Sequence, residues 1–282
     1  MADNSLFNEN NVLITDAQLH AFMKKYGVTK HHHDVNIYRK ALLHRSYCTR
    51  KNDNFVNGNI ECPSNCLPLQ EESNQRLEFL GDAVLNFVVG DYLYQRYPDV
   101  NEGFLTRIRT RLVNGNMLAW LAEKMDLGKY LVISKPIEQN NGRANKKILE
   151  DAFEAFLGAI YMDYNSFKIN TSGKMAAIDN SGIGFQIVYT FIQNVLEMYV
   201  DFPDLVHQKD NPKDKFMKQC QHIYQWTPKL LEVDVTEEDN VKIHTICIRN
   251  KNNDVVAIGK GCSRKVAEIN ACSTALDYYG WT

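Results

Sequence analysis

The apolar residues of this chain follow two different periods, and the change comes just after residue 200. Before it, apolar residues recur at helical spacing in long runs, which predicts helices only. After it, a helix from Pro212, three strand-like runs and a helix from about Ser263 follow one another. The sequence therefore predicts an α+β multidomain protein: an all-α domain over 1–202, a linker over 203–211 and a small α-β-β-β-α domain over 212–282.

Six helical segments are expected in the first domain: 17–27, 35–47, 75–97, 103–125, 146–164 and 185–200. Two stretches interrupt them. Residues 48–73 are rich in Asn, Pro and Ser, and residues 165–184 are polar and contain several glycines. We expect both to be surface loops, since the apolar residues in them recur at neither helical nor strand spacing.

The charge of the whole molecule does not indicate a nucleic-acid or membrane partner. The net charge is −2, and residues 201–282 hold eleven Lys and Arg against twelve Asp and Glu, so any site for a polyanion must be a local patch. No apolar run approaches the roughly 18 residues of a membrane-spanning helix, and the start of the chain lacks a secretory pattern. Seven scattered cysteines do not form a disulfide framework. We expect an intracellular, cytoplasmic protein with no membrane partner.

Two pairs of carboxylates lie inside apolar helical segments. Glu78 and Asp82 are four residues apart in "RLEFLGDAVL", and Asp151 and Glu154 are three apart in "ILEDAFEAFLGAI". Each pair shares one face of a helix. A buried ionised carboxylate is costly unless it is paired or coordinates a metal. No Lys or Arg is expected at helical spacing to neutralise either pair, so four carboxylates on two crossing helices suit Mg²⁺, which takes oxygen ligands.

The alternative is that these acids are ordinary solvated surface, as most carboxylate pairs at this spacing are. Two pairs embedded among Leu, Phe, Val and Ala make that alternative weaker than it is for one pair. Glu150 and Asp163 fall on other faces of the second helix and are expected to be solvated. Magnesium held by such a cluster can activate water and stabilise a phosphoryl transition state.

At these residues the sequence resembles the ribonuclease III family. The segments "NQRLEFLGDAVL" and "LEDAFEAFLGAIYMD" are similar to its two acidic motifs, and "ALLHRSY" and "NEGFLTRIRTRLVNGNMLAWLA" to its other helical motifs. The last seventy residues resemble a double-stranded RNA-binding domain. Four motifs in the family's order cover nearly the whole chain.

The resemblance implies a double-stranded RNA-specific endoribonuclease. Glu78, Asp82, Asp151 and Glu154 would bind the catalytic metal, Mg²⁺ with Mn²⁺ as a substitute. It implies cleavage that leaves 5′-phosphates and short 3′ overhangs, and a homodimer with one cluster per subunit. The competing interpretation is a non-catalytic protein that binds or sequesters double-stranded RNA; the presence of all four acids favours the enzyme.

Two further residues are expected to act beside the cluster without binding the metal. Gln75 stands where the family usually has Glu, so one negative charge is missing there. Glu102 occupies a position where the family also has an acid, although a Glu at a helix start is also an ordinary stabilising choice. We expect Gln75 to tune metal binding and not to abolish activity.

The resemblance also assigns RNA contacts in the last domain. Ser263, Arg264 and Lys265 in "GCSRKVAE" would meet phosphates at the start of a helix, and Lys218 would add charge from the first helix. The loop after the first strand, "VTEEDNVKIH", is acidic and lacks the family's Gly and Pro, with His244 expected inside the strand. We therefore expect weaker RNA binding than is usual for this domain.

One weaker metal hypothesis concerns cysteine. Cys62 and Cys66, with Cys48 and the run His31 to His33, could form a zinc site, but their spacing is poor. Inert thiols and solvated histidines are the competing interpretation.

Overall fold

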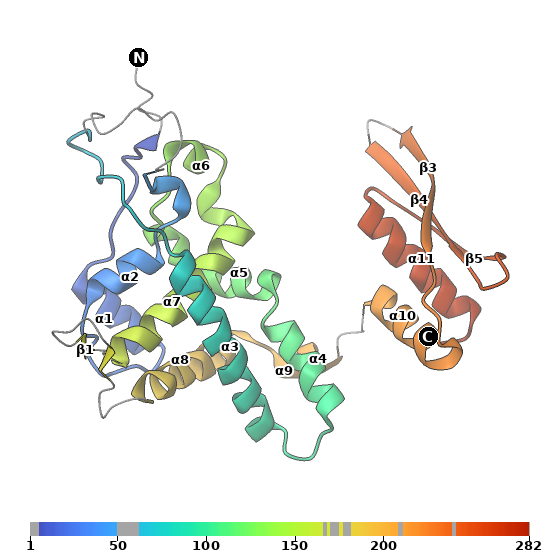
Figure 1. Cartoon of the computed structure of the whole chain (residues 1–282), viewed down its shortest axis with the longest axis horizontal. Coiled ribbons are helices and arrows are strands. Elements are labelled where there is room, and N and C mark those ends of the chain that lie inside the picture. The colour runs from blue at the N-terminus through green and yellow to red at the C-terminus, as the bar shows by residue number, and fades with distance from the viewer. Residues whose placement is uncertain are drawn as a thin grey trace. The chain divides into compact units, whose positions relative to one another are not determined.

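The computed structural model describes residues 6–49, 62–165, 182–207, 211–238 and 241–281, together with the strands 168–169 and 175–176. The chain divides into two compact units, Met1–Val206 and His207–Thr282 (Figure 1). Among the described residues, no helix is long and apolar enough to cross a membrane. All seven cysteines are free.

The first unit is built around one central helix. The helix α7 (Lys146–Tyr164) contacts α2 (Val35–Ala41), α3 (Gln75–Arg96), α5 (Gly115–Lys124) and α8 (Ile183–Tyr199). Most residues of α7 are buried, including a continuous run from Ala152 to Ile160. A helix that is buried over most of its length needs neighbours around it, and this one packs against four helices. The remaining helices are α1 (Asp16–Lys25), α4 (Glu102–Leu112), α6 (Lys135–Gln139) and α9 (Phe202–His207).

Several boundaries differ from the sequence prediction because polar side chains cap helices inside the expected runs. The segment 103–125 is two helices, since Asn114 accepts a hydrogen bond from Met117 N at 3.1 Å and begins α5. The segment 35–47 ends as a helix at Ala41 and continues to a short 3-10 helix, Arg45–Tyr47, capped by His44. The short elements α6, Leu127–Tyr130 and Gly142–Ala144 were not expected.

The segments expected to be a linker and loops contain some regular structure. Helix α9 lies across much of 203–211, with Phe202 and Leu205 buried in the core of the first unit. Within 165–184, strands β1 (Lys168–Ile169) and β2 (Met175–Ala176) pair antiparallel. Residues 50–61 of the first segment and most of 165–184 lie outside the described residues. The domain boundaries at 202 and 212 stay a prediction.

The second unit has the expected α-β-β-β-α order. Strands β3 (Leu230–Glu238), β4 (Val241–Arg249) and β5 (Val255–Gly261) form an antiparallel sheet in chain order. Helix α10 (Pro212–Tyr224) packs on α11 (Arg264–Tyr278), and α11 packs on β4 and β5. A core of its own joins the helices to the sheet, with Phe216 and Cys220 packed against Ile246. The predicted α+β fold class is confirmed.

Candidate active site

Helices α3 and α7 approach so closely at two glycines that their backbones touch. A Cβ atom on Gly81 would lie 1.7 Å from the carbonyl oxygen of Glu154, and one on Gly158 would lie 2.3 Å from that of Leu77. Real Cβ atoms do not come so close to backbone atoms, so both positions require glycine. This crossing places the acidic residues of α3 against those of α7.

Three of the four predicted acids meet at the crossing. Carboxylate oxygens of Glu78, Asp151 and Glu154 all lie within 4.8 Å of one another. Glu154 is buried, with 7% of its surface exposed, whereas Glu78 and Asp151 are half-buried. Asp82 is exposed and outside this group of three, and its Oδ1 accepts a hydrogen bond from Asn86 at 2.9 Å. Asp82 is still near enough for its charge to act on Glu154.

The electrostatics of the cluster favour a bound cation. Burial first, and then the negative charges of Asp82, Glu150 and Glu78, raise the pKa of Glu154 to about 8, against an opposing effect of Lys147. The pKa of Glu78 is also raised, by burial and by Asp151. An excess of negative charge on partly buried oxygens is what a hard divalent cation relieves.

Lys147 is the cation that the sequence prediction missed. Its Nζ lies 2.8 Å from Asp151 Oδ1 and 3.3 Å from Glu150 Oε2, and these contacts raise the pKa of Lys147. The expectation that no Lys or Arg at helical spacing neutralises the pairs was therefore wrong for Asp151, because Lys147 precedes it by one helical turn. That spacing of four in "KILED" was the signal that could have found it.

Two more acids of α7 differ from the expectation of solvated side chains. Glu150 is half-buried and its charge acts on both Glu78 and Glu154. Asp163 is only 6% exposed. It accepts hydrogen bonds from the backbone N–H groups of His33 and Asp34, at 2.8–3.2 Å, and from the hydroxyl of Tyr38 at 3.1 Å. Asp163 therefore anchors the loop before α2 to α7 and is no part of the cluster.

His44 is a neighbour of the cluster that sequence reasoning used only as part of a motif. Its Nδ1 lies 2.9 Å from the hydroxyl of Ser46 and accepts the Ser46 N–H at 3.2 Å. Burial, and then the charge of Arg45, lower the pKa of His44, while Asp151 acts in the opposite direction. Burial and Arg45 therefore disfavour the charged form of this imidazole.

Gln75 and Glu102 both stand at helix starts. Gln75 is the exposed first residue of α3, and its Oε1 accepts a hydrogen bond from Ser73 at 3.2 Å. Glu102 is the exposed first residue of α4 and accepts from the Thr106 hydroxyl at 2.8 Å. Neither belongs to the group of three converging acids.

In the second unit, Ser263 and Arg264 are already engaged within the chain. Ser263 caps α11 by accepting the Val266 N–H at 3.3 Å. Arg264 Nε donates to Glu268 at 3.2 Å, and its guanidinium lies 3.9 Å from Glu232. Arg264 can therefore reach a phosphate only in exchange for, or in addition to, these acidic partners.

The lysines of the second unit differ in their partners. Lys265 and Lys218 are exposed, so both are placed to meet a phosphate. Lys213, a third lysine of this unit, is half-buried and lies 2.5 Å from Glu268. His244 lies within β4, as expected, with Nδ1 2.6 Å from Glu232.

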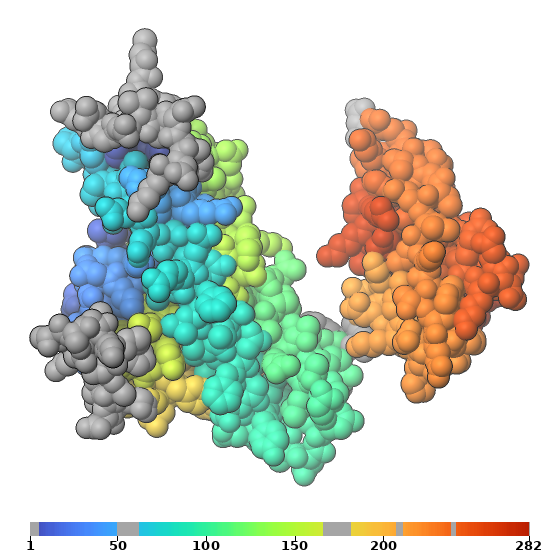
Figure 2. Space-filling view, viewed as in Figure 1, coloured from blue at the N-terminus to red at the C-terminus, as the bar shows by residue number. Residues whose placement is uncertain are grey.

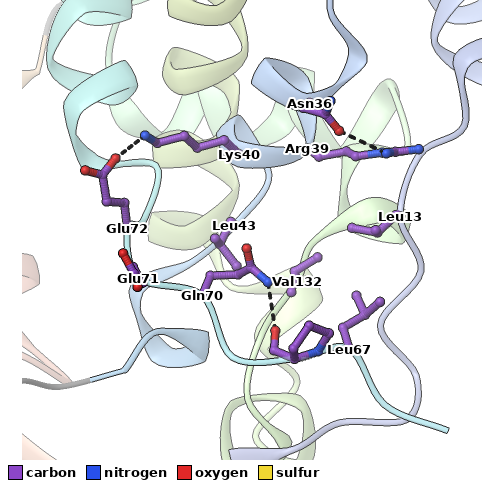
Figure 3. Close-up of a pocket in the computed structure, with 11 residues that line it drawn as sticks. Leu13, Asn36, Arg39, Lys40, Leu43, Leu67, Gln70, Glu71, Glu72 and Val132 are labelled. Atoms are coloured by element: carbon purple, nitrogen blue, oxygen red, sulfur yellow. Dashed lines mark hydrogen bonds and ion pairs between the residues drawn. The ribbon is translucent and has the colours of Figure 1, made fainter. Parts of the chain in front are cut away.

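A pocket of about 540 Å³ in the first unit contains none of the four acids (Figure 3). It lies beside α2, where Lys40 forms an ion pair with Glu72. Leu13, Leu43 and Val132 provide apolar lining. It is a feature separate from the acidic cluster.

The fold and the acidic cluster define a class of protein: a helical domain with converging carboxylates, followed by a small α-β-β-β-α unit. Residues 34–171 match the family model "Ribonuclease-III-like", and residues 212–279 match "Double-stranded RNA binding motif". Ribonuclease 3 of Borreliella afzelii is 32% identical over 92% of this chain and 91% of its own length. A probable ribonuclease 3 of Acanthamoeba polyphaga mimivirus is 32% identical over 98% of this chain, which spans 47% of that protein.

A solved structure, the nuclease domain of ribonuclease III from Campylobacter jejuni, matches with 29% identity and a TM-score of 0.46. The match covers 66% of this chain and 99% of that one. From the family models and the sequence relatives, the chain belongs to the ribonuclease III family. The sequence-based recognition of the family is confirmed.

Proposed function

We propose that this protein is an endoribonuclease that hydrolyses phosphodiesters in double-stranded RNA with a metal ion held at the α3–α7 crossing. The observation that carries the proposal is the convergence of Glu78, Asp151 and Glu154 within 4.8 Å, in a member of this family. Asp82 completes the set from the exposed side. The products would carry 5′-phosphates and short 3′ overhangs.

The donors of the cluster fit Mg²⁺. All are carboxylate oxygens, the ligands that a hard cation prefers, and Mn²⁺ accepts the same donors. When bound, the ion would activate a water molecule and stabilise the charge that develops on the phosphate. The chain's own contribution is to hold the oxygens on two rigid helices and to keep Glu154 buried, so that its ionisation depends on a cation.

A homodimer is supported by the apolar surface of α3. Phe79, Phe87 and Tyr94 are 82%, 65% and 71% exposed. Figure 2 shows that α3, in teal, lies at the surface of the first unit. Large exposed apolar side chains gathered on one element mark an interaction site. A second copy of the same surface would cover them, and each subunit's cluster would then cut one RNA strand.

The second unit would hold the duplex through Ser263, Arg264, Lys265 and Lys218. A domain of this kind reads the shape of A-form RNA through phosphates and 2′-hydroxyls. The N-terminus of α11 adds partial positive charge beside Ser263. The non-catalytic alternative has no support from the comparisons.

The test is cleavage of long double-stranded RNA with Mg²⁺, with Mn²⁺, with Ca²⁺ and with a chelator. We expect short duplex products with Mg²⁺ or Mn²⁺, ligatable 5′-phosphates, and no cleavage of single-stranded RNA or of DNA duplexes. Binding of the duplex without cleavage under every metal condition would instead identify a non-catalytic binding protein.

A further inference from the structure

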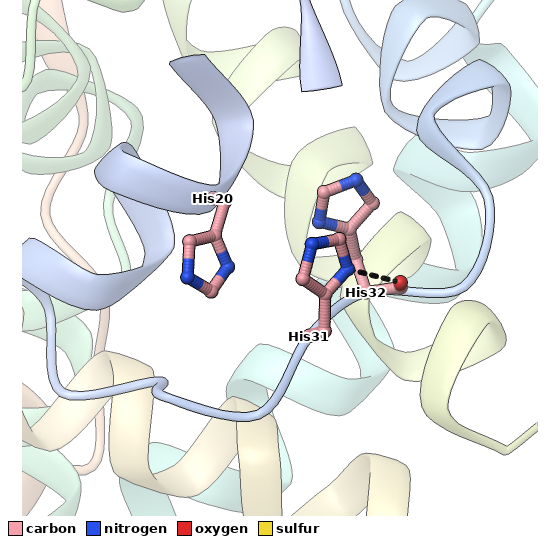
Figure 4. Close-up of side chains that lie close together, drawn as sticks. All are labelled: His20, His31 and His32. Carbon is pink, nitrogen blue, oxygen red and sulfur yellow. Dashed lines mark hydrogen bonds between the residues drawn. The ribbon is translucent and has the colours of Figure 1, made fainter. Parts of the chain in front are cut away.

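Three histidines of the first unit gather at a place that the nuclease chemistry does not use. His20 lies on α1, and His31 and His32 lie in the loop between α1 and α2 (Figure 4). Each offers one ring nitrogen, and these three atoms lie within 4.8 Å of one another. Figure 4 shows that a ring nitrogen of His20 points toward the other two rings.

Hydrogen bonds fix which nitrogen of His31 and of His32 has a free lone pair. His31 Nδ1 is 3.0 Å from the carbonyl oxygen of His32, which can only accept, so Nδ1 carries the proton and Nε2 keeps the lone pair. His31 Nε2 lies 3.8 Å from Asp16 Oδ2, beyond hydrogen-bond distance. His32 Nε2 is 2.8 Å from Asp16 Oδ1. Because the carboxylate accepts, His32 Nδ1 is the unprotonated nitrogen.

Two ring nitrogens of these histidines are buried without a hydrogen-bond partner among the described residues. Among the described residues, neither His20 Nδ1 nor His32 Nδ1 has a hydrogen-bond partner. The side chain of His32 is 1% exposed. A buried polar atom left unsatisfied is destabilising, so a native structure that keeps two such atoms close together needs an explanation.

We propose that His20, His31 and His32 form a zinc-binding site, with Asp16 orienting His32. Zinc takes neutral imidazole nitrogens in tetrahedral geometry, and a carboxylate that accepts the other N–H of a ligand histidine is a usual companion of such sites. The side chains of His31 and Asp16 are 60% and 62% exposed, so the fourth position opens to solvent. Bonds of about 2.0–2.1 Å would draw the rings slightly closer together.

The site differs in chemistry from the acidic cluster, since its donors are nitrogens and Mg²⁺ prefers oxygen. Its place in the fold indicates a structural role. The ion would tie the loop to α1, and the same loop is anchored to α7 through Asp163. The cysteine-based site weighed from the sequence has no such geometry, because no described cysteine belongs to a metal-ligand group.

The rival explanation is simple ring stacking. The centroids of the His20 and His31 rings are 4.7 Å apart, as are those of His31 and His32, with interplanar angles of 16° and 24°. Stacking would survive replacement of one imidazole by phenyl, whereas zinc binding would not. His31→Phe is therefore the informative variant, at a position that is exposed.

The experiment uses the full chain, stripped of metal and kept in a large excess of Mg²⁺ so that the acidic cluster is occupied. Zinc bound per chain is measured by elemental analysis after gel filtration, and Co²⁺ is added as a spectroscopic probe. We expect one zinc ion per chain, a rise in Tm with zinc, and tetrahedral Co²⁺ absorption without a thiolate charge-transfer band.

His31→Phe should weaken zinc binding at least ~100-fold and remove the rise in Tm. His33→Phe is the matched control, because His33 is the exposed neighbour outside the group and should bind zinc as the wild type does. His20→Gln should repeat the loss if His31→Phe fails to fold. No zinc binding by the wild type, or equal binding by the His31 and His33 variants, would overturn the proposal.

Discussion

The two units differ in how far their charged side chains are neutralised by neighbours of opposite charge. At the α3–α7 crossing, acids outnumber cations, and the pKa of Glu154 rises to about 8. In the second unit, Lys213 and Arg264 donate to one acid, Glu268, at 2.5 and 3.2 Å, and lower its pKa. The first site holds an excess of negative charge. The second has already neutralised part of the positive charge that it would offer to RNA.

This difference separates binding from chemistry. A cluster of under-neutralised carboxylates on rigid helices gains strongly from a metal, so its removal should stop turnover. A surface whose cations already have acidic partners gains less from each phosphate, so its changes should be graded and dependent on salt.

Glu154→Gln should reduce cleavage of double-stranded RNA at least ~100-fold at saturating Mg²⁺, because it removes a charged oxygen ligand while keeping the volume of the side chain. RNA affinity and oligomeric state should not change. Single-turnover kinetics measure the cleavage rate, binding assays measure the RNA affinity, and light scattering measures the oligomeric state.

Glu123→Gln is the matched control, since Glu123 is an exposed acid on α5 outside the group of converging acids, and this variant should cleave normally. A near-normal rate for Glu154→Gln would remove Glu154 from the set of ligands.

The stability of the metal-free protein should depend on the same carboxylate. The pKa of Glu154 is about 8 in the fold against 4.5 for an ordinary Glu, so the unfolded chain loses this proton first as pH rises. The free energy of unfolding should therefore fall between about pH 5 and pH 8, by at most a few kcal/mol. Denaturant unfolding in a chelator measures it.

Glu154→Gln should flatten most of this pH dependence, and Mg²⁺ should reduce it in the wild type by favouring the ionised form. A wild-type stability that rises with pH over the same window, in the absence of metal, would contradict the assigned environment of Glu154.

Gly81→Ala should destabilise the first unit by about 1–3 kcal/mol or more, because its Cβ would collide with the backbone of Glu154 and push α3 from α7. Mg²⁺ affinity should fall with it. Gly90→Ala on the same helix is the control, since the nearest atom to its Cβ would be 4.0 Å away.

Alanine at Gly90 should stabilise the helix by about 0.5–1 kcal/mol. Thermal unfolding and Mg²⁺ titration of the pair measure the effect of helix separation. Equal stability of the two variants would show that the crossing is not close-packed at Gly81.

The sequence predicts the residues at the α3–α7 crossing but not the distance between the two helices. The acids, the glycines and the helices carrying them are visible in "RLEFLGDAVL" and "LEDAFEAFLGAI" because helical periodicity fixes which residues share a face. The limits of α3 and α7 follow from the same pattern and agree closely with the structure. The distance between the two helices was not predictable, because it depends on which backbones can touch.

The missed features depend on partners distant in the chain or on the choice of a rotamer. Asp163 is buried because its acceptors serve N–H groups some 130 residues earlier. Lys147 could have pointed to solvent, and only the folded structure places it on Asp151. Helix α9 is stabilised by burial of Phe202 and Leu205 in a core whose other members are far away in sequence. The local pattern of apolar residues does not indicate contacts between residues that are distant in sequence.

The double change of Arg264 and Lys265 to Ala should weaken RNA binding and flatten its salt dependence by about one to two in the slope of log K against log[salt]. Turnover of bound RNA should stay the same, because the acids are untouched. Lys251→Ala, at the turn between β4 and β5, is the control.

Removal of the second unit should repeat this defect, and the cut belongs after His207 so that the buried Leu205 of α9 is kept. An unchanged salt slope for the double variant would indicate that the second unit makes protein contacts instead.

The smallest expected effect is that of Gln75→Glu. Gln75 begins α3 one turn before Glu78, so a carboxylate there would lie on the same helical face at about 5–6 Å. It would add negative charge near the cluster but remain solvated, since Gln75 is exposed. Screening by water limits the gain, and we expect a two- to five-fold lower Mg²⁺ concentration at half-maximal cleavage, roughly 0.4–1 kcal/mol. The maximal rate should not change, and the shift should shrink as salt rises.

Gln95→Glu, at the other end of α3, controls for general charge and should leave the Mg²⁺ titration unchanged. Identical curves for Gln75→Glu and the wild type would show that only the carboxylates at the crossing itself set the affinity for the metal.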